Sequence, residues 1–147
     1  MRKIMPPTYF MVLLALAFMV HFFFPIMKIS IRPYNYPGWI LIAFGIIINL
    51  WADSLMKQKQ TTVKPHQNPS IFISSGPFRL SRHPMYLGML SILLGTALLL
   101  GSLAPFIFPA AFIILMETLF IPTEENNMKK NFGKEYLDYK AKVRRWV

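Results

Sequence analysis

The sequence predicts an all-α integral membrane protein with about four transmembrane helices. Apolar residues make up 54% of the 147 residues and are gathered into blocks, whereas a soluble domain would disperse them. Each block is close to the roughly 20 residues that a helix needs to cross the hydrocarbon core of a bilayer. The length fits one domain, so we treat residues 1–147 as a single membrane-embedded unit.

The first two apolar blocks run from about residue 8 to 27 and from about residue 36 to 56. Arg2 and Lys3 precede the first block, as in a signal peptide. The run is long for that role, however, and no small-x-small cleavage site follows it, so we expect a retained helix. In the second block, Pro37 suits the first turn of a helix, a position that needs no amide donor.

The third block begins at Pro84 and ends near Leu103, and the fourth runs from about Ala104 to Pro122. Their connection is so short that the two helices are expected to be antiparallel neighbours. Small residues recur along one face of the third helix, where they let helices approach closely in lipid. These residues are Gly88, Ser91, Gly95 and Ser102.

Positive charge predicts the orientation of the chain. The N-terminus, the loop after the second block and the C-terminal tail carry 14 of the 16 Lys and Arg residues, all except Lys28 and Arg32. By the positive-inside rule, both termini and this second loop are expected in the cytoplasm, with the protein in the cell (inner) membrane. A basic soluble protein that binds nucleic acid would not need four bilayer-length apolar blocks. With no cysteine and three widely separated histidines, the sequence predicts no metal site.

Two long polar segments lie next to the third and fourth blocks. The first, about residues 57–84, is too long for a simple connection and is expected to be functional. Its apolar patch at 71–73 is expected to pack back onto the membrane face. The second segment, 120–147, is expected to be a helix that leaves the membrane, with a break near Gly133 and with Trp146 as an interfacial anchor.

The two polar segments bring opposite charges to the same end of the predicted hairpin. The first carries Arg79, Arg82, His83 and Tyr86, and the second carries Glu124 and Glu125. Ser81 or His83 is expected to cap the third helix. Two interpretations stay open: an ion pair between Arg82 and Glu124 that pins the hairpin, or a site for a polar ligand. The ion pair alone does not explain the histidine, proline, tyrosine and glycine beside the charges.

The stretch "SGPFRLSRHPMYLG", followed after one hairpin by "EENNMKKNFGKEYLDYKAKV", resembles the isoprenylcysteine carboxyl methyltransferase family, which includes related phospholipid methyltransferases. The resemblance covers about residues 61–147, and residues 1–60 supply two generic helices. The family pattern is R-H-P-x-Y-x-G, then E-E, then F-G-x-E-Y-x-x-Y. It is met by Arg82, His83, Pro84, Tyr86, Gly88, Glu124, Glu125, Phe132, Gly133, Glu135, Tyr136 and Tyr139.

This resemblance implies a multi-pass membrane enzyme that uses S-adenosylmethionine and takes its acceptor from the lipid. The cofactor is expected in the C-terminal half, 61–147, at a cytoplasmic site formed by the second loop, the helical hairpin and the tail. The implied cofactor-binding residues are Arg82, His83, Tyr86, Gly88, Glu124, Glu125 and Tyr136. Eukaryotic members often carry a histidine shortly before the Gly-Pro stretch, where this sequence has 68–70 (Asn-Pro-Ser) and its nearest histidine is His66. That departure weakens the transfer of a prenylcysteine substrate.

The chemistry of S-adenosylmethionine agrees with these residues, because its carboxylate, ammonium, sulfonium and ribose hydroxyls need partners of both charges. Arg82 and His83 can bind the carboxylate, whereas Glu124 and Glu125 can bind the ammonium or the hydroxyls through charge-assisted hydrogen bonds. The ring of Tyr86 can face the adenine or attract the sulfonium. The chain has no glycine-rich Rossmann fingerprint, which excludes the soluble type of methyltransferase fold.

Glu117 lies inside the fourth block and is a third catalytic candidate beside Arg82 and His83. It precedes Glu124 by seven residues, so both are expected on about the same helical face. It either lines the cofactor or acceptor cavity or has a hydrogen-bonded structural role. Outside this end, we expect His21 to bond a neighbouring helix. We expect Asp53 either to pair with a loop lysine or to reach the site.

The acceptor is left open between an isoprenylcysteine-like carboxylate, a lipid amine and another lipophilic small molecule. A carboxylate needs no base, whereas an amine or phenol must lose a proton, which His83 or a glutamate can accept. A second copy of the chain is a candidate for completing the acceptor cavity. Two alternatives remain: a sterol-reductase-like enzyme that binds NADPH, and a non-catalytic membrane protein whose basic tail binds anionic lipid.

Overall fold

The computed structural model describes residues 5–24, 28, 33–60 and 71–147, and these are mostly helical. The helices α1 (Pro6–Phe23), α2 (Pro37–Gln58) and α3 (Pro84–Leu100) precede a continuous helical run, made of α4 (Ile107–Leu115), the π-helical turn η3 (Met116–Phe120) and α5 (Ile121–Lys142). Two short 3₁₀ turns, η1 (Gly76–Arg79) and η2 (Ala104–Phe106), precede α3 and α4. In the described part the one extended pairing is an isolated bridge between Lys28 and Ser102.

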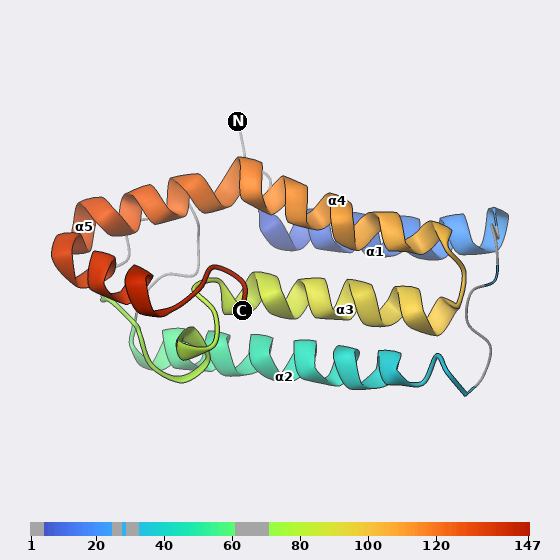
Figure 1. The fold of residues 1–147 in the computed structure, drawn as a ribbon, viewed down its shortest axis with the longest axis horizontal. Helices are drawn as coiled ribbons and strands as arrows, with labels where there is room; N and C mark the ends of the chain where they lie inside the picture. The colour runs from blue at the N-terminus through green and yellow to red at the C-terminus, as the bar shows by residue number, and fades with distance from the viewer. Residues whose placement is uncertain (1–4, 25–27, 29–32, 61–70) are drawn as a thin grey trace.

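The helices form a bundle with α3 at its centre (Figure 1). Helix α2 lies on one side of α3, and α1 and α4 lie on the other, where they also contact each other. Helix α5 continues beyond the end of α4 and then folds back, so that the C-terminus lies beside the start of α3. The antiparallel hairpin predicted for the third and fourth helices is therefore present.

Three helical segments are long and apolar enough to cross a membrane: α1, α2 and the run that begins at Ala104. Helix α3 is apolar but has 17 residues, so it spans about 25 Å. It ends at Leu100 rather than near Leu103, because Gly101 adopts a left-handed conformation (φ 69°) that terminates the helix. The prediction of an all-helical membrane protein is confirmed, with α3 as the shortest of the four expected spans.

Helices α2 and α3 approach each other closely through glycines. A Cβ atom on Gly95 would lie 2.5 Å from the carbonyl oxygen of Gly38, and one on Gly38 would lie 2.5 Å from that of Gly95. About two helical turns further along α2, a Cβ atom on Gly45 would overlap the carbonyl oxygen of Gly88. Gly88 and Gly95 of the predicted small-residue face thus pack against α2. Ser102 does not belong to this face, because it lies beyond the end of α3.

His21 does form a hydrogen bond across the bundle, but its partner lies in the connection after α3 rather than in a neighbouring helix. His21 Nδ1 lies 2.7 Å from the hydroxyl of Ser102, which joins α1 to the turn before α4. The prediction that Asp53 pairs with a loop lysine is wrong in one respect. Its partner, Lys57 Nζ at 2.6 Å, belongs to α2 itself, because this helix continues to Gln58.

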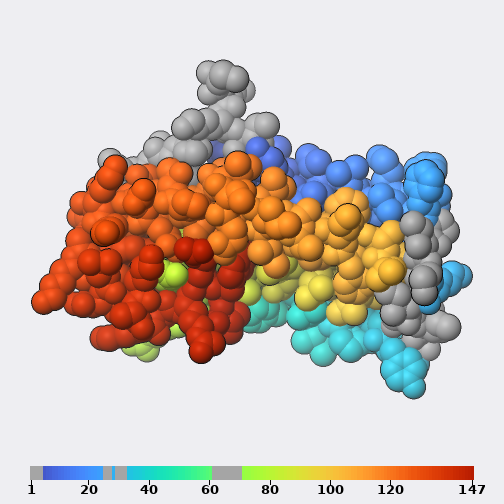
Figure 2. Space-filling view, turned by 45° about the horizontal axis from the view of Figure 1, so that its top comes forward, coloured from blue at the N-terminus to red at the C-terminus, as the bar shows by residue number. Residues whose placement is uncertain are grey.

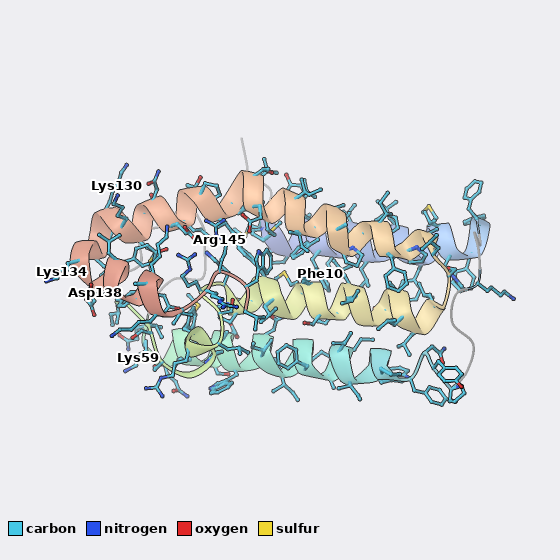
Figure 3. All side chains as sticks on the ribbon, in the orientation of Figure 1. Phe10, Lys59, Lys130, Lys134, Asp138 and Arg145 are labelled. Carbon is cyan, nitrogen blue, oxygen red and sulfur yellow. The ribbon has the colours of Figure 1, made fainter. Side chains whose placement is uncertain are left out.

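The hydrophobic core lies at the end of α3 that carries the charges. Leu93, Phe112, Met116 and Ile121 are almost completely buried there, between α3 and the α4–α5 run. Side chains of α1, among them Phe10, pack against this cluster (Figure 3). The core thus supports the helix start at which the polar residues gather.

The long run from α4 to α5 is interrupted twice. The π-helical turn Met116–Phe120 changes the register along the helix, and Gly133 (φ 48°, ψ −119°) breaks it, as predicted. The expectation that Glu117 and Glu124 share one helical face assumed unbroken 3.6-residue spacing. With the π-turn between them, their carboxylates share no partner among the described residues.

The apolar patch at 71–73 has a packing partner that the sequence did not predict. The ring of Phe72 lies 5.4 Å from the ring of Phe132 and 5.2 Å from that of Tyr139, so the patch contacts the part of α5 around and after its break. Ile73 is buried, whereas Ile71 is exposed. The patch therefore packs against α5, and its expected position on the membrane face stays a prediction. Residues 61–70, with His66 and the departure at 68–70, lie outside the described residues.

Candidate functional site

The segment just before α3 is fixed by hydrogen bonds to the C-terminal residues. The buried Ser81 hydroxyl donates to the carbonyl oxygen of Arg145 at 2.8 Å, and the Arg82 amide donates to that of Arg144 at 3.0 Å. The Ser81 hydroxyl also accepts the His83 amide at 3.1 Å. His83 is the N-cap residue of α3, but its side chain makes no capping bond. Its ring is therefore free to take part in the site.

Four basic side chains converge on the buried carboxylate of Glu125. Arg145 binds it with two nitrogens, Nε at 3.0 Å and Nη2 at 3.1 Å, and Lys140 Nζ lies 3.1 Å away. Arg82 contacts it through Nη2 at 3.3 Å, and His83 Nε2 is 3.6 Å away. The predicted ion pair between Arg82 and Glu124 is therefore wrong, because the partner of Arg82 is the next glutamate along the helix.

Glu124 instead pairs with the residues at the start of α3. His83 Nδ1 lies 3.2 Å from Glu124 Oε2, and the Tyr86 hydroxyl donates to Glu124 Oε1. The rings of His83 and Tyr86 stack, with centroids 5.6 Å apart and planes 7° from parallel. Tyr86 is thus held in the core by its ring and at the site by its hydroxyl.

The two glutamates control the protonation of His83. Burial alone would lower the pKa of the imidazole, but the close contact with Glu124 and the negative charges of both glutamates raise it above the ordinary value of 6.5. The protonated, cationic form of His83 therefore persists to higher pH than in an ordinary histidine.

Residues Arg144–Trp146, here called the C-terminal clasp, close over this cluster. Arg145 Nη1 donates to Glu117 Oε2 at 2.6 Å, and Trp146 Nε1 donates to Glu117 Oε1 at 2.7 Å. Figure 3 shows Arg145 between the α4–α5 run and the start of α3, whereas Lys130 and Lys134 point away from the molecule. Figure 2 shows the clasp, in red, at the surface beside α5.

The sequence interpretation missed Arg145 and the partners of Trp146. Trp146 packs against the core cluster and binds Glu117, contacts that the sequence did not predict, and its expected place at the membrane interface stays a prediction. One signal was available: an acidic residue inside an apolar helix such as Glu117 needs a donor or a cation, and the tail is rich in both.

Several buried donors near the glutamates lack partners among the described residues. They are Arg82 Nε, Arg82 Nη1 and His83 Nε2. The 3.6 Å separation of His83 Nε2 from Glu125 is too long for a hydrogen bond. Buried donors left without a partner are costly, so a group of three points to a ligand that carries hydrogen-bond acceptors.

Tyr136, a predicted site residue, is buried beside the same charges. Burial and the charge of Glu125 raise the pKa of its hydroxyl, whereas Arg82 and Arg145 act in the opposite direction. Its ring lies at right angles to that of Phe72 and 6.3 Å from it.

The other predicted site residues are placed differently. Gly88 lies in the α2–α3 interface against Asn49, a contact that accounts for the glycine without a ligand. Arg79 is exposed on η1 and does not join the converging charges.

The described residues thus combine helices long enough to cross a membrane with a buried cluster of opposite charges at one end of the bundle. The profile of the phospholipid methyltransferase family matches residues 34–135, and the chain belongs to this family. The resemblance found from the motifs is confirmed at this level. The match includes most of the converging residues but ends before the clasp.

Curated relatives point the same way. Two proteins from rice, Oryza sativa subsp. indica and subsp. japonica, are each named as a probable protein-S-isoprenylcysteine O-methyltransferase and are 31% identical over 114 residues. These matches cover 74% of the chain and 58% of each relative, so the chain matches little more than half of their length. An uncharacterized protein of Haemophilus influenzae is 41% identical over 63 residues, which is 43% of the chain and the whole of that protein.

Proposed function

We propose that the protein is an S-adenosylmethionine-dependent methyltransferase that methylates a lipophilic acceptor at the cytoplasmic face of the membrane. The observation that carries the proposal is the group of unpartnered buried donors on Arg82 and His83 beside two glutamates. Family membership supports methyl transfer as the reaction. An NADPH-binding reductase is disfavoured, because the cofactor's several phosphates would need more free cations than these two side chains provide.

The donor set fits the amino-acid part of S-adenosylmethionine. Arg82 Nε and Nη1, together with His83 Nε2, would bind its carboxylate. Glu124 is the more open glutamate, with 19% of its side chain exposed against 9% for Glu125, so we assign the ammonium or the ribose hydroxyls to Glu124. Glu125 serves instead as the anchor of the basic side chains. When bound, the cofactor supplies an electrophilic methyl group.

The protonation of His83 favours one class of acceptor. A histidine can serve as a general base only when it is neutral, and the ion pair of His83 with Glu124, which helps to raise its pKa, disfavours the neutral form. An amine or phenol acceptor would lack this base, whereas a carboxylate is already a nucleophile. We therefore propose a lipophilic carboxylate as the acceptor. Glu117, bound to Arg145 and Trp146, is assigned to holding the clasp, with no base role.

The setting of the reaction follows from the charges of the chain. The loop and tail that carry most of the Lys and Arg residues flank the cofactor site, which supports a cytoplasmic site in the cell membrane with both termini on the same side. The cofactor would then enter from water and the acceptor from lipid.

Calorimetry on the detergent-purified protein tests the cofactor assignment. The wild type is expected to bind S-adenosylmethionine, and Arg82→Ala and Glu124→Ala are each expected to weaken binding by tenfold or more, which is about 1.4 kcal/mol. Glu135→Ala, an exposed glutamate on α5, serves as the control. No binding by a folded wild type, with NADPH tested alongside, would contradict the proposal.

Transfer of a labelled methyl group tests the acceptor class. Lipophilic carboxylates, including an S-prenylated cysteine derivative, are expected to be labelled, whereas a phosphatidylethanolamine vesicle is not. Labelling of the lipid amine alone would reverse the acceptor assignment.

A further inference from the structure

We propose that Arg145 is a positioning residue that occupies Glu125 and thereby leaves Arg82 free to bind the carboxylate of the cofactor. This inference rests on the proposed function. It assigns a role to the C-terminal clasp, which lies beyond the residues matched by the family profile.

The first step is a competition for one carboxylate. Two parallel N–H···O bonds are the favoured geometry between an arginine and a carboxylate, and Arg145 has this geometry on Glu125 through Nε and Nη2. Lys140 adds a third contact, to Oε2. Arg82 is left with one contact at 3.3 Å, through Nη2 alone. The two other nitrogens of its guanidinium are consequently buried and unpaired.

The second step is the rigidity of Arg145 itself. Its remaining nitrogen, Nη1, binds Glu117 Oε2, and the indole of Trp146 occupies the other oxygen of Glu117. Its carbonyl oxygen accepts the hydroxyl of Ser81, next to Arg82 in the chain. One residue therefore ties together the π-helical turn, the glutamate on α5 and the segment before α3.

Removing Arg145 should therefore impair one function of the site, the binding of a carboxylate by Arg82. Arg82, the nearest remaining arginine, can then take the two-bond geometry on Glu125, which uses up nitrogens that are now free. The site loses its anion-binding donors while the rest of the pocket stays in place. Ligands that carry a carboxylate should therefore bind more weakly, whereas ligands that lack one should bind with unchanged affinity.

The test compares two probes of the same nucleoside. S-adenosylhomocysteine carries the amino-acid carboxylate, whereas 5′-methylthioadenosine is a nucleoside thioether without the amino-acid part. In Arg145→Ala, we expect calorimetry to show at least tenfold weaker binding of S-adenosylhomocysteine and less than twofold change for methylthioadenosine. Arg145→Lys keeps a charge but cannot form the two-bond pair, so it should give an intermediate loss for the first probe only. Lys142→Ala, which removes an exposed cation three residues away, should change neither.

The outcomes separate the inference from the proposed function. If the wild type binds neither probe, the proposed function fails and the inference falls with it. If the wild type binds both and Arg145→Ala weakens both equally or neither, the inference alone is overturned. Thermal unfolding of each variant identifies a general loss of structure, and if Arg145→Ala does not fold, the same comparison with Arg145→Lys decides.

Discussion

The α2–α3 interface and the charged end of α3 belong to one helix, yet they are held together in opposite ways. The interface depends on missing side chains, since glycines on each helix lie against backbone oxygens of the other. The charged end depends on side chains brought from three distant segments, around residues 82, 125 and 145. Larger side chains should weaken the α2–α3 interface, whereas removal of a charge should weaken the charged end of α3. Substitutions can therefore measure the contribution of each region to stability separately.

The largest loss of stability is expected for a substitution of Glu125. Glu125→Ala leaves Arg82, Arg145 and Lys140 without their shared counter-ion, two of them only partly exposed to water. Breaking a buried pair from one side typically costs about 3–5 kcal/mol, and we expect the lower end because Lys140 reaches solvent. Unfolding in mixed detergent measures the loss. Glu135→Ala, with the same chemistry at an exposed position, should cost far less, and equal losses would contradict the central role of Glu125.

A smaller loss is expected in the glycine interface. Gly95→Ala places a methyl group 2.5 Å from the Gly38 carbonyl oxygen, so the helices must separate, at a cost of about 1–3 kcal/mol. Ala43→Leu, which adds more volume on the exposed side of α2, is the control and should be nearly neutral. Cofactor binding by the folded Gly95→Ala protein should survive better than in Glu125→Ala. The opposite order would mean that the two regions are not independent.

The stability of the charged end should depend on pH through His83. Because its folded pKa is raised above 6.5, its contribution is fully present below pH 6.5 and is lost as the pH rises through the folded pKa. The groups that face it are Glu124, Glu125, Arg82 and Tyr86. We expect the difference in melting temperature between wild type and His83→Gln to shrink from mildly acidic to alkaline pH. A difference that grows with pH would reverse the sign of the shift.

The smallest effect is expected at the exposed pair on α2. Lys57 is 75% exposed and pairs with Asp53 one helical turn earlier. Such pairs contribute about 0.5 kcal/mol or less, so Lys57→Ala should be within that range of the wild type in the same unfolding assay. A cost near that of Gly95→Ala would show that surface charge matters more here than the interface does.

The same contrast explains what the sequence could predict. The spans, the small-residue face of α3 and the break at Gly133 follow from local spacing and backbone preferences, and the structure agrees with them. The charges were correctly brought to one end, because helix order alone determines that. Their pairing was not predictable. Glu124 and Glu125 are neighbours on a helix whose register depends on a π-turn, and nothing local marks that turn.

The contacts of the C-terminal clasp could not be predicted from the sequence for a related reason. Its contacts join residues separated by 64 positions, such as Ser81 and Arg145, and no periodic pattern records them. The indirect signal was the acid at Glu117, whose need for partners could be inferred although the partners could not. The spacing of residues in this sequence therefore does not predict which side chains pair when they lie far apart along the chain.

The position of Arg145 also bears on when the protein becomes competent during its synthesis. Helices α1 to α3 leave the ribosome before the tail does, so they can fold before the tail contacts the start of α3. Glu117 and Glu125 gain their contacts with Arg145 only after residue 145 has emerged from the ribosome and folded back. If the proposed role of Arg145 holds, an incomplete chain that ends within α5 would not yet bind the cofactor.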